Sequence, residues 1–163
     1  FTKSVETANR LVRLVAFFEE AWSRHTNTPA LQVRFYSSDL GTGERIQLLR
    51  DFQHGHIDLL VCSDLIARGI DLPHVRHVIS YDVPVDMAKY VHRVGRTARA
   101  GRAGDAWSLV EEQEVYHFKR MLREAGHFDH MHKHKVKSDA FDTYLPCYRD
   151  ALVRLAHMYS QQR

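Results

Sequence analysis

The sequence predicts an α/β fold: a three-layer sandwich in which a mostly parallel sheet lies between two layers of helices. Segments typical of strands alternate with segments of helical spacing along most of the chain, and strands that are separated by helices pair in parallel. Residues 59–62 form a continuous apolar run, which is typical of a parallel strand covered on both faces. In such a sheet, ligands bind at the carboxyl-terminal ends of the strands.

The first half of the chain contains two predicted helices that alternate with strands. Residues 1–3 are typical of the end of a buried strand, and Ser4 can cap the next helix by accepting a hydrogen bond from a free backbone N–H group. Apolar residues recur at helical spacing from residue 5 to about 22. Alternating apolar residues predict a strand at 31–35, and a second helix is expected over about 43–52.

The second half of the chain continues this alternation. Strands are expected at 75–81 and 106–110, and helices over about 86–94 and 112–125. Gly126 is a plausible stop for the last of these helices.

The tail differs in character from the rest. Residues 126–137 are rich in histidine and lysine, and residues 139–160 carry apolar side chains that can form a closing helix. A chain of 163 residues can bury one substantial core and is too short for two full domains of this class. We therefore expect one domain at 1–125, followed at 126–163 by a basic linker and a C-terminal helix that packs on the domain or on a partner.

The composition is that of an ordinary globular protein. Apolar residues make up 44% and charged residues 26% of the chain, and no apolar run approaches the roughly 20 residues that span a bilayer. We therefore expect a soluble protein with no membrane partner. Cys62 lies in the apolar run and Cys147 is the only other cysteine, so we expect a buried thiol in a reducing, intracellular compartment. The 23 Lys and Arg, the 12 His and a pI near 9.0 favour a polyanionic partner without identifying one.

Two arrays of residues carry the strongest chemical signal. The first is HRVGRTARAG at 92–101, in which arginines three positions apart can share a helix face and glycines allow close approach of a phosphate. A guanidinium group can donate two parallel hydrogen bonds to phosphoryl oxygens and stays charged at cellular pH, so this array suits a polyphosphate. The second array, SDLIARGID at 63–71, begins where the apolar strand ends, which is where a parallel sheet binds its ligands.

Together the two arrays resemble motif VI (HRxGRTxR) and motif V ([ST]Dxx[AS]RGxD) of DEAD-box helicases. The intervening YDVP at 81–84 and Tyr90 match the Asp-x-Pro and Tyr-x-His pieces of the family, and His92 favours the DEAD-box over the DEAH group. The resemblance covers about residues 1–125. It implies a C-terminal RecA-like domain, which forms one wall of a cleft for ATP and RNA. The other wall is the N-terminal RecA-like domain of the same protein.

The resemblance implies nucleotide-site roles for several residues. Arg96 and Arg99 correspond to arginine fingers that reach the γ-phosphate of ATP, an effect worth about 10³–10⁵ in rate. Asp71 corresponds to the carboxylate that binds the ATP ribose, with Gly69 beside it, and His92 to the residue that couples to the acidic motif of the other domain. The Mg²⁺ that accompanies ATP is held mainly by that other domain. We expect the arginine pair on the side of the sheet where the strands end.

The resemblance also implies an RNA site. The positions that bind RNA phosphates in the family match Ser4, Arg45, Ser63 and the backbone near Gly69 in this chain. Such contacts recognise the backbone and the 2′-hydroxyl group, so RNA binding is expected to be largely independent of base sequence. One departure concerns the Gln-x-x-Arg of the family, which is TGER at 42–45 here: the arginine is kept and the glutamine is not.

Two short pieces suggest a subfamily. Residues 36–40 (YSSDL) and 62–64 (CSD) resemble most the DEAD-box helicases that act in large-subunit ribosome assembly in the nucleolus. This implies pre-ribosomal RNA as substrate, ribosome-assembly factors as partners and the nucleolus, within the nucleus, as location. The chain contains neither a Gly-x-x-x-x-Gly-Lys-[Ser/Thr] loop nor an Asp-Glu-Ala-Asp box, so by itself it is expected to hydrolyse no ATP.

Each site residue also has a purely structural interpretation. The arginines of the 92–101 array could lie on a solvated basic face, and Asp71 could cap or pair locally. Arg45 and Ser63 could be helix-surface and strand-end residues without a ligand, and an N-cap role alone accounts for Ser4. For the whole protein, the alternatives are a helicase-derived docking module that never hydrolyses ATP and a motor that acts on DNA.

The histidines at 127–134 are compatible with a metal site, since imidazoles bind zinc. No cysteine or carboxylate pattern completes such a site, and we expect no metal. The alternation of these histidines with Lys133, Lys135 and Lys137 favours an exposed basic linker that contacts structured RNA or an assembly partner.

Overall fold

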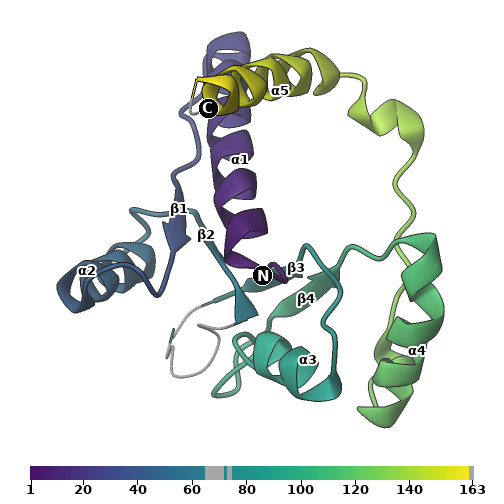
Figure 1. Cartoon of the computed structure of the whole chain (residues 1–163). Helices are drawn as coiled ribbons and strands as arrows, with labels where there is room; N and C mark the ends of the chain where they lie inside the picture. Colours follow the sequence, from purple (N-terminus) through teal and green to yellow (C-terminus); the bar gives the residue numbers. More distant parts are fainter. Residues whose placement is uncertain (65–71, 73–74, 162–163) are drawn as a thin grey trace.

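The computed structural model describes residues 1–64, 72 and 75–161, and each helix and strand expected from the sequence has a counterpart in it (Figure 1). The elements in chain order are α1 (Val5–Thr26), β1 (Val33–Tyr36), α2 (Thr42–Gln53), β2 (Leu59–Cys62), β3 (His77–Ser80), α3 (Met87–Val94), β4 (Asp105–Ser108), η2 (Glu112–Glu114), α4 (Val115–Glu124), η3 (Phe128–His130), η4 (Ser138–Phe141) and α5 (Leu145–Ser160).

The strands pair in parallel, as the sequence predicts. β1 pairs with β2 and β3 pairs with β4, both in parallel. The first two residues join the two pairs: the Thr2 N–H group donates to the Cys62 carbonyl at 3.0 Å, and the Tyr81 N–H group donates to the Phe1 carbonyl at 2.9 Å. The order across the sheet is therefore β1, β2, residues 1–2, β3 and β4.

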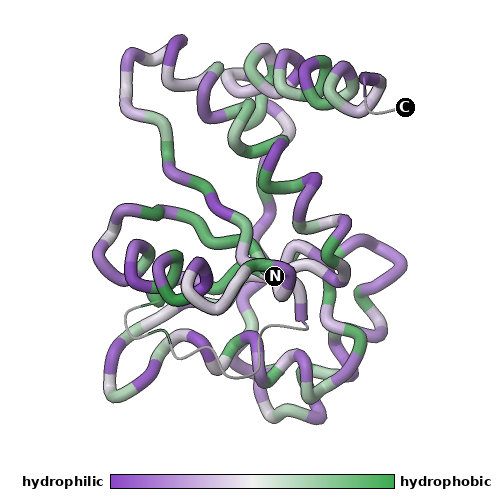
Figure 2. The backbone as a smooth tube through the Cα atoms, turned by 60° about the vertical axis from the view of Figure 1, so that its left-hand side comes forward, coloured by the Kyte–Doolittle hydropathy of each residue, from purple (hydrophilic) through white to green (hydrophobic). Residues whose placement is uncertain are grey.

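Helices cover both faces of β1 and β2. On one face, Val33 and Val61 pack with Ala8 of α1, and on the other face Tyr36 and Cys62 pack against apolar residues of α2. Figure 2 shows hydrophobic residues concentrated in the central strands, whereas hydrophilic and hydrophobic positions alternate along the helices. This pattern gives the three-layer arrangement, because each strand sends alternate side chains to opposite faces.

A second cluster lies between α3 and α4. Tyr90 of α3 packs with Phe118, Met121 and Leu122 of α4. On the other side of this part of the sheet, Ile79 of β3 and Trp107 of β4, which are register partners, remain exposed.

The closing helix packs across α1. Arg154 of α5 forms an ion pair with Glu20 at 2.6 Å and lies over the Phe17 ring at 4.2 Å, while Tyr144 contacts Trp22 with ring centroids 4.8 Å apart. The predicted helix is thus present, with Leu145 as its first residue, and its partner is the first helix of the chain.

The two thiols are buried and unpaired. Cys62 is 6% exposed, which confirms the buried thiol expected for the apolar run, and this burial raises the pKa of the thiol to about 11. No described helix is both long enough and apolar enough to cross a bilayer.

Candidate RNA and nucleotide sites

Three predicted RNA contacts lie where strands end. Ser63 directly follows β2 and pairs in parallel with Thr2. Ser4 follows the same central strand segment and caps α1, where its hydroxyl accepts from the Thr7 N–H group at 3.0 Å. Arg45 lies in the first turn of α2, after β1. The carboxyl-terminal edge of the sheet therefore carries all three, as the topology of a parallel sheet requires.

Two of these residues have buried polar atoms without a hydrogen-bond partner among the described residues. They are the Ser63 hydroxyl, in a residue that is 1% exposed, and Nε of Arg45. Such an atom costs about 1–3 kcal/mol when nothing pairs with it. Both groups can donate to a phosphate oxygen. Ser4 differs, because its hydroxyl also donates to Thr7 Oγ1 at 2.9 Å and the capping role accounts for it.

The departure at 42–45 has a local consequence for α2. Glu44 closes the start of the helix, since its Oε2 accepts a hydrogen bond from the Gly41 N–H group at 2.9 Å. This contact stabilises the first turn and so orients Arg45, the one residue of the Gln-x-x-Arg piece that the chain keeps.

The arginine segment lies elsewhere, and our expectation that it sits on the side where the strands end is wrong. Thr97 is buried, and its hydroxyl lies 2.7 Å and 2.9 Å from the carbonyl oxygens of Val75 and Arg76, which directly precede β3. Arg96 and Arg99 flank Thr97. The reason is the direction of α3: this helix begins beyond the end of β3 and returns to the side where β3 and β4 begin.

The backbone after α3 has an uncommon conformation. Ala98 and Ala100 both have positive φ, at 54° and 53°, which costs a residue with a side chain of order 1–3 kcal/mol in strain. Gly104 packs against this turn, and a Cβ atom there would lie 1.9 Å from Thr97 Oγ1. The packing of Gly104 on Thr97 therefore holds the segment that carries Arg96 and Arg99, and Arg99 is exposed.

Of the other predicted nucleotide residues, His92 lies on α3 and is half-buried. Its backbone carbonyl accepts a hydrogen bond from Nε of Arg96 at 3.1 Å, so the two residues are coupled through the backbone. Gly69 and Asp71 fall outside the described residues.

An arginine that the sequence analysis did not single out connects the two regions. Arg93, on the last turn of α3, is 0% exposed. Its guanidinium binds both carboxylate oxygens of Asp64, at the end of β2, and also donates to the Asp82 carbonyl after β3. Helical spacing places Arg93 three positions after Tyr90, on the buried face of α3, and a buried guanidinium requires a carboxylate partner. That spacing was the signal that could have found it.

The described residues thus combine two groups of donors of the kind that phosphates accept hydrogen bonds from. One is a strand-end edge where Ser63 and Arg45 have donors without a partner among the described residues, and the other is a turn bearing two arginines. Residues 1–101 match the helicase conserved C-terminal domain family. The chain belongs to this family.

Relatives of this helicase domain agree with that assignment. The chain is 43% identical over 124 residues to the ATP-dependent RNA helicase dbp6 of Schizosaccharomyces pombe, covering 76% of this chain and 20% of that protein. It is 38% identical over 163 residues to the human ATP-dependent RNA helicase DDX51, covering 100% of this chain and 23% of that protein. The chain therefore spans between a fifth and a quarter of the length of these relatives.

Solved structures show the same fold. The helicase domain is similar to the C-terminal domain of the DEAD-box protein Dbp5, with a TM-score of 0.64 and 29% identity over 94% of this chain and 79% of that one. It is also similar to Mss116p bound to ssRNA and AMP-PNP, with a TM-score of 0.65 and 25% identity over 91% of this chain and 28% of that one. The chain is a RecA-like C-terminal domain of the DEAD-box type.

Proposed function

We propose that this domain is one lobe of an ATP-dependent RNA helicase, which closes with an N-terminal RecA-like lobe around ATP and RNA and separates RNA strands locally. The observation that carries the proposal is a pair of buried donors, Ser63 Oγ and Arg45 Nε, which have no hydrogen-bond partner among the described residues and lie at the predicted RNA positions. Their location at the strand-end edge, apart from the arginine turn, allows RNA and nucleotide to bind the lobe at the same time.

The arginine turn suits the nucleotide. Arg96 and Arg99 would lend positive charge to the phosphates of ATP held mainly by the other lobe, because guanidinium groups neutralise the charge that develops during phosphoryl transfer. Asp71, with Gly69, would hold the ribose. His92 would couple to the acidic motif of the other lobe when the two lobes close. ATP supplies the phosphoanhydride bond whose hydrolysis releases the RNA. The accompanying Mg²⁺ belongs to the other lobe in this proposal.

The RNA contacts are the hydroxyl and guanidinium groups of Ser63 and Arg45, with Ser4 and the backbone near Gly69. These groups recognise phosphates rather than bases, so binding independent of base sequence follows. The RNA in the solved complex of Mss116p is single-stranded, which supports a strand-separating role for this chain.

For the biological setting we propose pre-ribosomal RNA during assembly of the large ribosomal subunit, in the nucleolus and with assembly factors as partners. The support is the sequence resemblance at 36–40 and 62–64. We also propose residues 1–125 as the helicase lobe and 126–163 as a basic linker followed by a C-terminal helix that packs on this lobe.

The test is ATP hydrolysis by the full-length protein as a function of RNA concentration. Replacing Arg96 by Ala should lower kcat at least about a thousandfold, since an arginine finger is worth about 10³–10⁵, and should leave the half-saturating RNA concentration unchanged. Arg45→Ala should instead raise that concentration. Arg76→Ala removes an exposed charge just before β3 and serves as the control.

Three results would count against the proposal. Wild-type turnover in Arg96→Ala would refute the finger role. Full complementation by that variant in cells would favour the docking module, because a scaffold tolerates loss of hydrolysis. Stimulation by DNA as strong as by RNA would indicate a DNA-directed motor.

A further inference from the structure

The segment at 131–137, called the strap below, connects η3 with η4 and is held at both ends. On one side, Phe128 and Met131 pack against the cluster between α3 and α4, where the Tyr90 hydroxyl lies 2.9 Å from Nδ1 of His127. On the other side, η4 leads to Tyr144, which packs on Trp22 of α1. Figure 1 shows the strap as a drawn-out stretch between α4 and α5. Its position is therefore fixed by two anchors.

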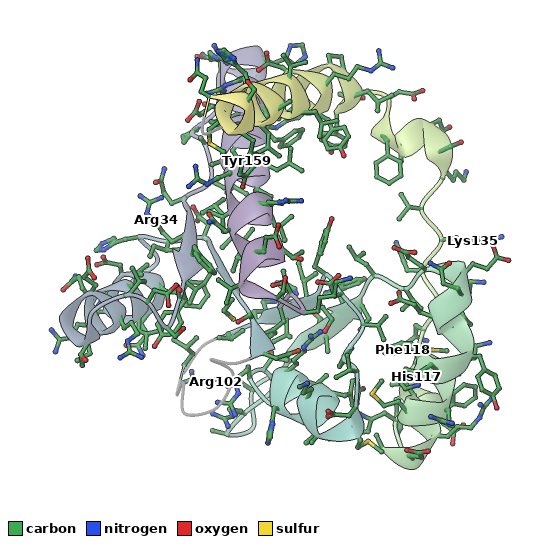
Figure 3. The ribbon with its side chains drawn as sticks, viewed as in Figure 1. Arg34, Arg102, His117, Phe118, Lys135 and Tyr159 are labelled. Atoms are coloured by element: carbon green, nitrogen blue, oxygen red, sulfur yellow. The ribbon has the colours of Figure 1, made fainter. Side chains whose placement is uncertain are left out.

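The strap presents its lysines outward. Its two end residues, Met131 and Lys137, have extended backbone, with ψ of 128° and 145°. The His134 ring lies edge-on to Trp107 of β4, with centroids 6.1 Å apart. The neighbouring Lys133 and Lys135, and Lys137 after them, are exposed. Figure 3 shows Lys135 directed away from α1.

The positive charge of these lysines is not neutralised within the described part of the chain. All three lysines are exposed, and in the described part of the chain none of them has an ion-pair partner, whereas Arg154 pairs with Glu20 and Arg10 with Glu6. The result is a cluster of three exposed ammonium groups within five residues of the chain.

We propose that Lys133, Lys135 and Lys137 form a second RNA site, which binds phosphates of the RNA backbone. Lysine ammonium groups are point charges that suit phosphates. Val136 is the single exposed apolar side chain of the strap, all of whose residues the structure describes, so the strap offers little of the apolar surface that protein interfaces rely on, which favours RNA over an acidic protein. The choice of RNA as the polyanion rests on the proposed function. In Figure 1 the strap and α2 lie on opposite sides of the molecule, so this site is separate from Arg45.

The experiment measures binding of the full-length protein to a fluorescent RNA hairpin with a single-stranded overhang, over a series of KCl concentrations. The test variant is K133Q/K135Q/K137Q, and K133R/K135R/K137R keeps the charge. The control R24Q/R120Q/R149Q removes three exposed positive charges elsewhere on the surface. Circular dichroism checks that all variants keep the fold.

We expect the glutamine variant to bind the hairpin at least about tenfold more weakly at about 0.1 M KCl. The slope of log Kd against log[KCl] should fall by about 2–3, at roughly 0.7–0.9 for each phosphate that the protein no longer neutralises. The arginine variant should match wild type. At saturating RNA, kcat for ATP hydrolysis should be unchanged in all three variants, because the strap lies outside the arginine turn.

Affinity and slope equal to those of the control variant would overturn the strap proposal while leaving RNA-stimulated hydrolysis, and hence the proposed function, intact. Unchanged RNA binding with loss of a co-purifying acidic protein would overturn it in favour of a protein partner. RNA binding that depends on the strap in a protein without RNA-stimulated hydrolysis would uphold the strap and overturn the helicase function. A wild-type protein that binds no RNA would overturn both.

Discussion

The guanidinium of Arg93 donates to both carboxylate oxygens of Asp64, at 2.6 Å from Nε to Oδ1 and 2.7 Å from Nη2 to Oδ2. Asp64 directly follows Ser63, and Arg93 precedes Arg96 by three residues. The pair therefore ties the predicted RNA edge to the predicted nucleotide turn through one rigid contact. Bidentate geometry of this kind fixes orientation as well as distance.

Replacing Asp64 by Asn should destabilise the fold by about 3–5 kcal/mol, because it leaves the charge of Arg93 buried without its partner. The midpoint of urea unfolding measures the loss. In the matched control, Glu6→Gln breaks the exposed pair with Arg10, which should cost less than about 1 kcal/mol. An equal loss of folding stability in the two variants would show that the buried pair stabilises the fold no more than the exposed pair does. The double variant D64N/R93M should recover part of the stability, since it removes the unpaired charge.

Replacing Gly104 by Ala should lower kcat for ATP hydrolysis and the unfolding midpoint together. The added Cβ would lie 1.9 Å from Thr97 Oγ1 and 2.7 Å from the Ala98 nitrogen, so the turn that carries Arg96 and Arg99 must move. Gly43→Ala is the control, because no atom lies within 4 Å of a Cβ at that position in α2. Steady-state kinetics and thermal unfolding of both full-length variants test this, and a Gly104→Ala enzyme with normal kcat would contradict it.

Cys62 should resist alkylation at pH 8. Burial raises the pKa of its thiol from 9.0 to about 11, which lowers the thiolate fraction at that pH about a hundredfold, at tenfold for each pH unit. Peptide mass spectrometry after iodoacetamide treatment should show slow labelling that becomes fast in urea.

The same shift affects stability. The folded state holds the thiol proton more tightly than the unfolded state, so the contribution of this group is complete below about pH 9 and is lost as the pH rises toward 11. Alkylation of Cys62 in the native protein as fast as in urea would contradict the burial from which both expectations follow.

The parallel order of the sheet was predictable, because it follows from the alternation of helix and strand along the chain. Residues 59–62 are the clearest instance: the continuous apolar run and the strand β2 have the same limits. The strand-end positions of Ser63 and Arg45 follow from the same topology. The closing helix also follows from its apolar spacing, although its packing against α1 does not.

What the sequence determined by itself was local: periodicity set the helices and strands, and two motifs set the family and the residues that bear charge. Tertiary structure decided which of those residues meet. The pairing of Arg93 with Asp64 joins positions 29 residues apart, and the return of α3 placed Arg96 and Arg99 where β3 and β4 begin. Neither can be derived from spacing along the sequence, because each depends on the path of the chain in three dimensions. The carboxylate that pairs with a buried arginine can be identified only when the fold shows which groups are buried together.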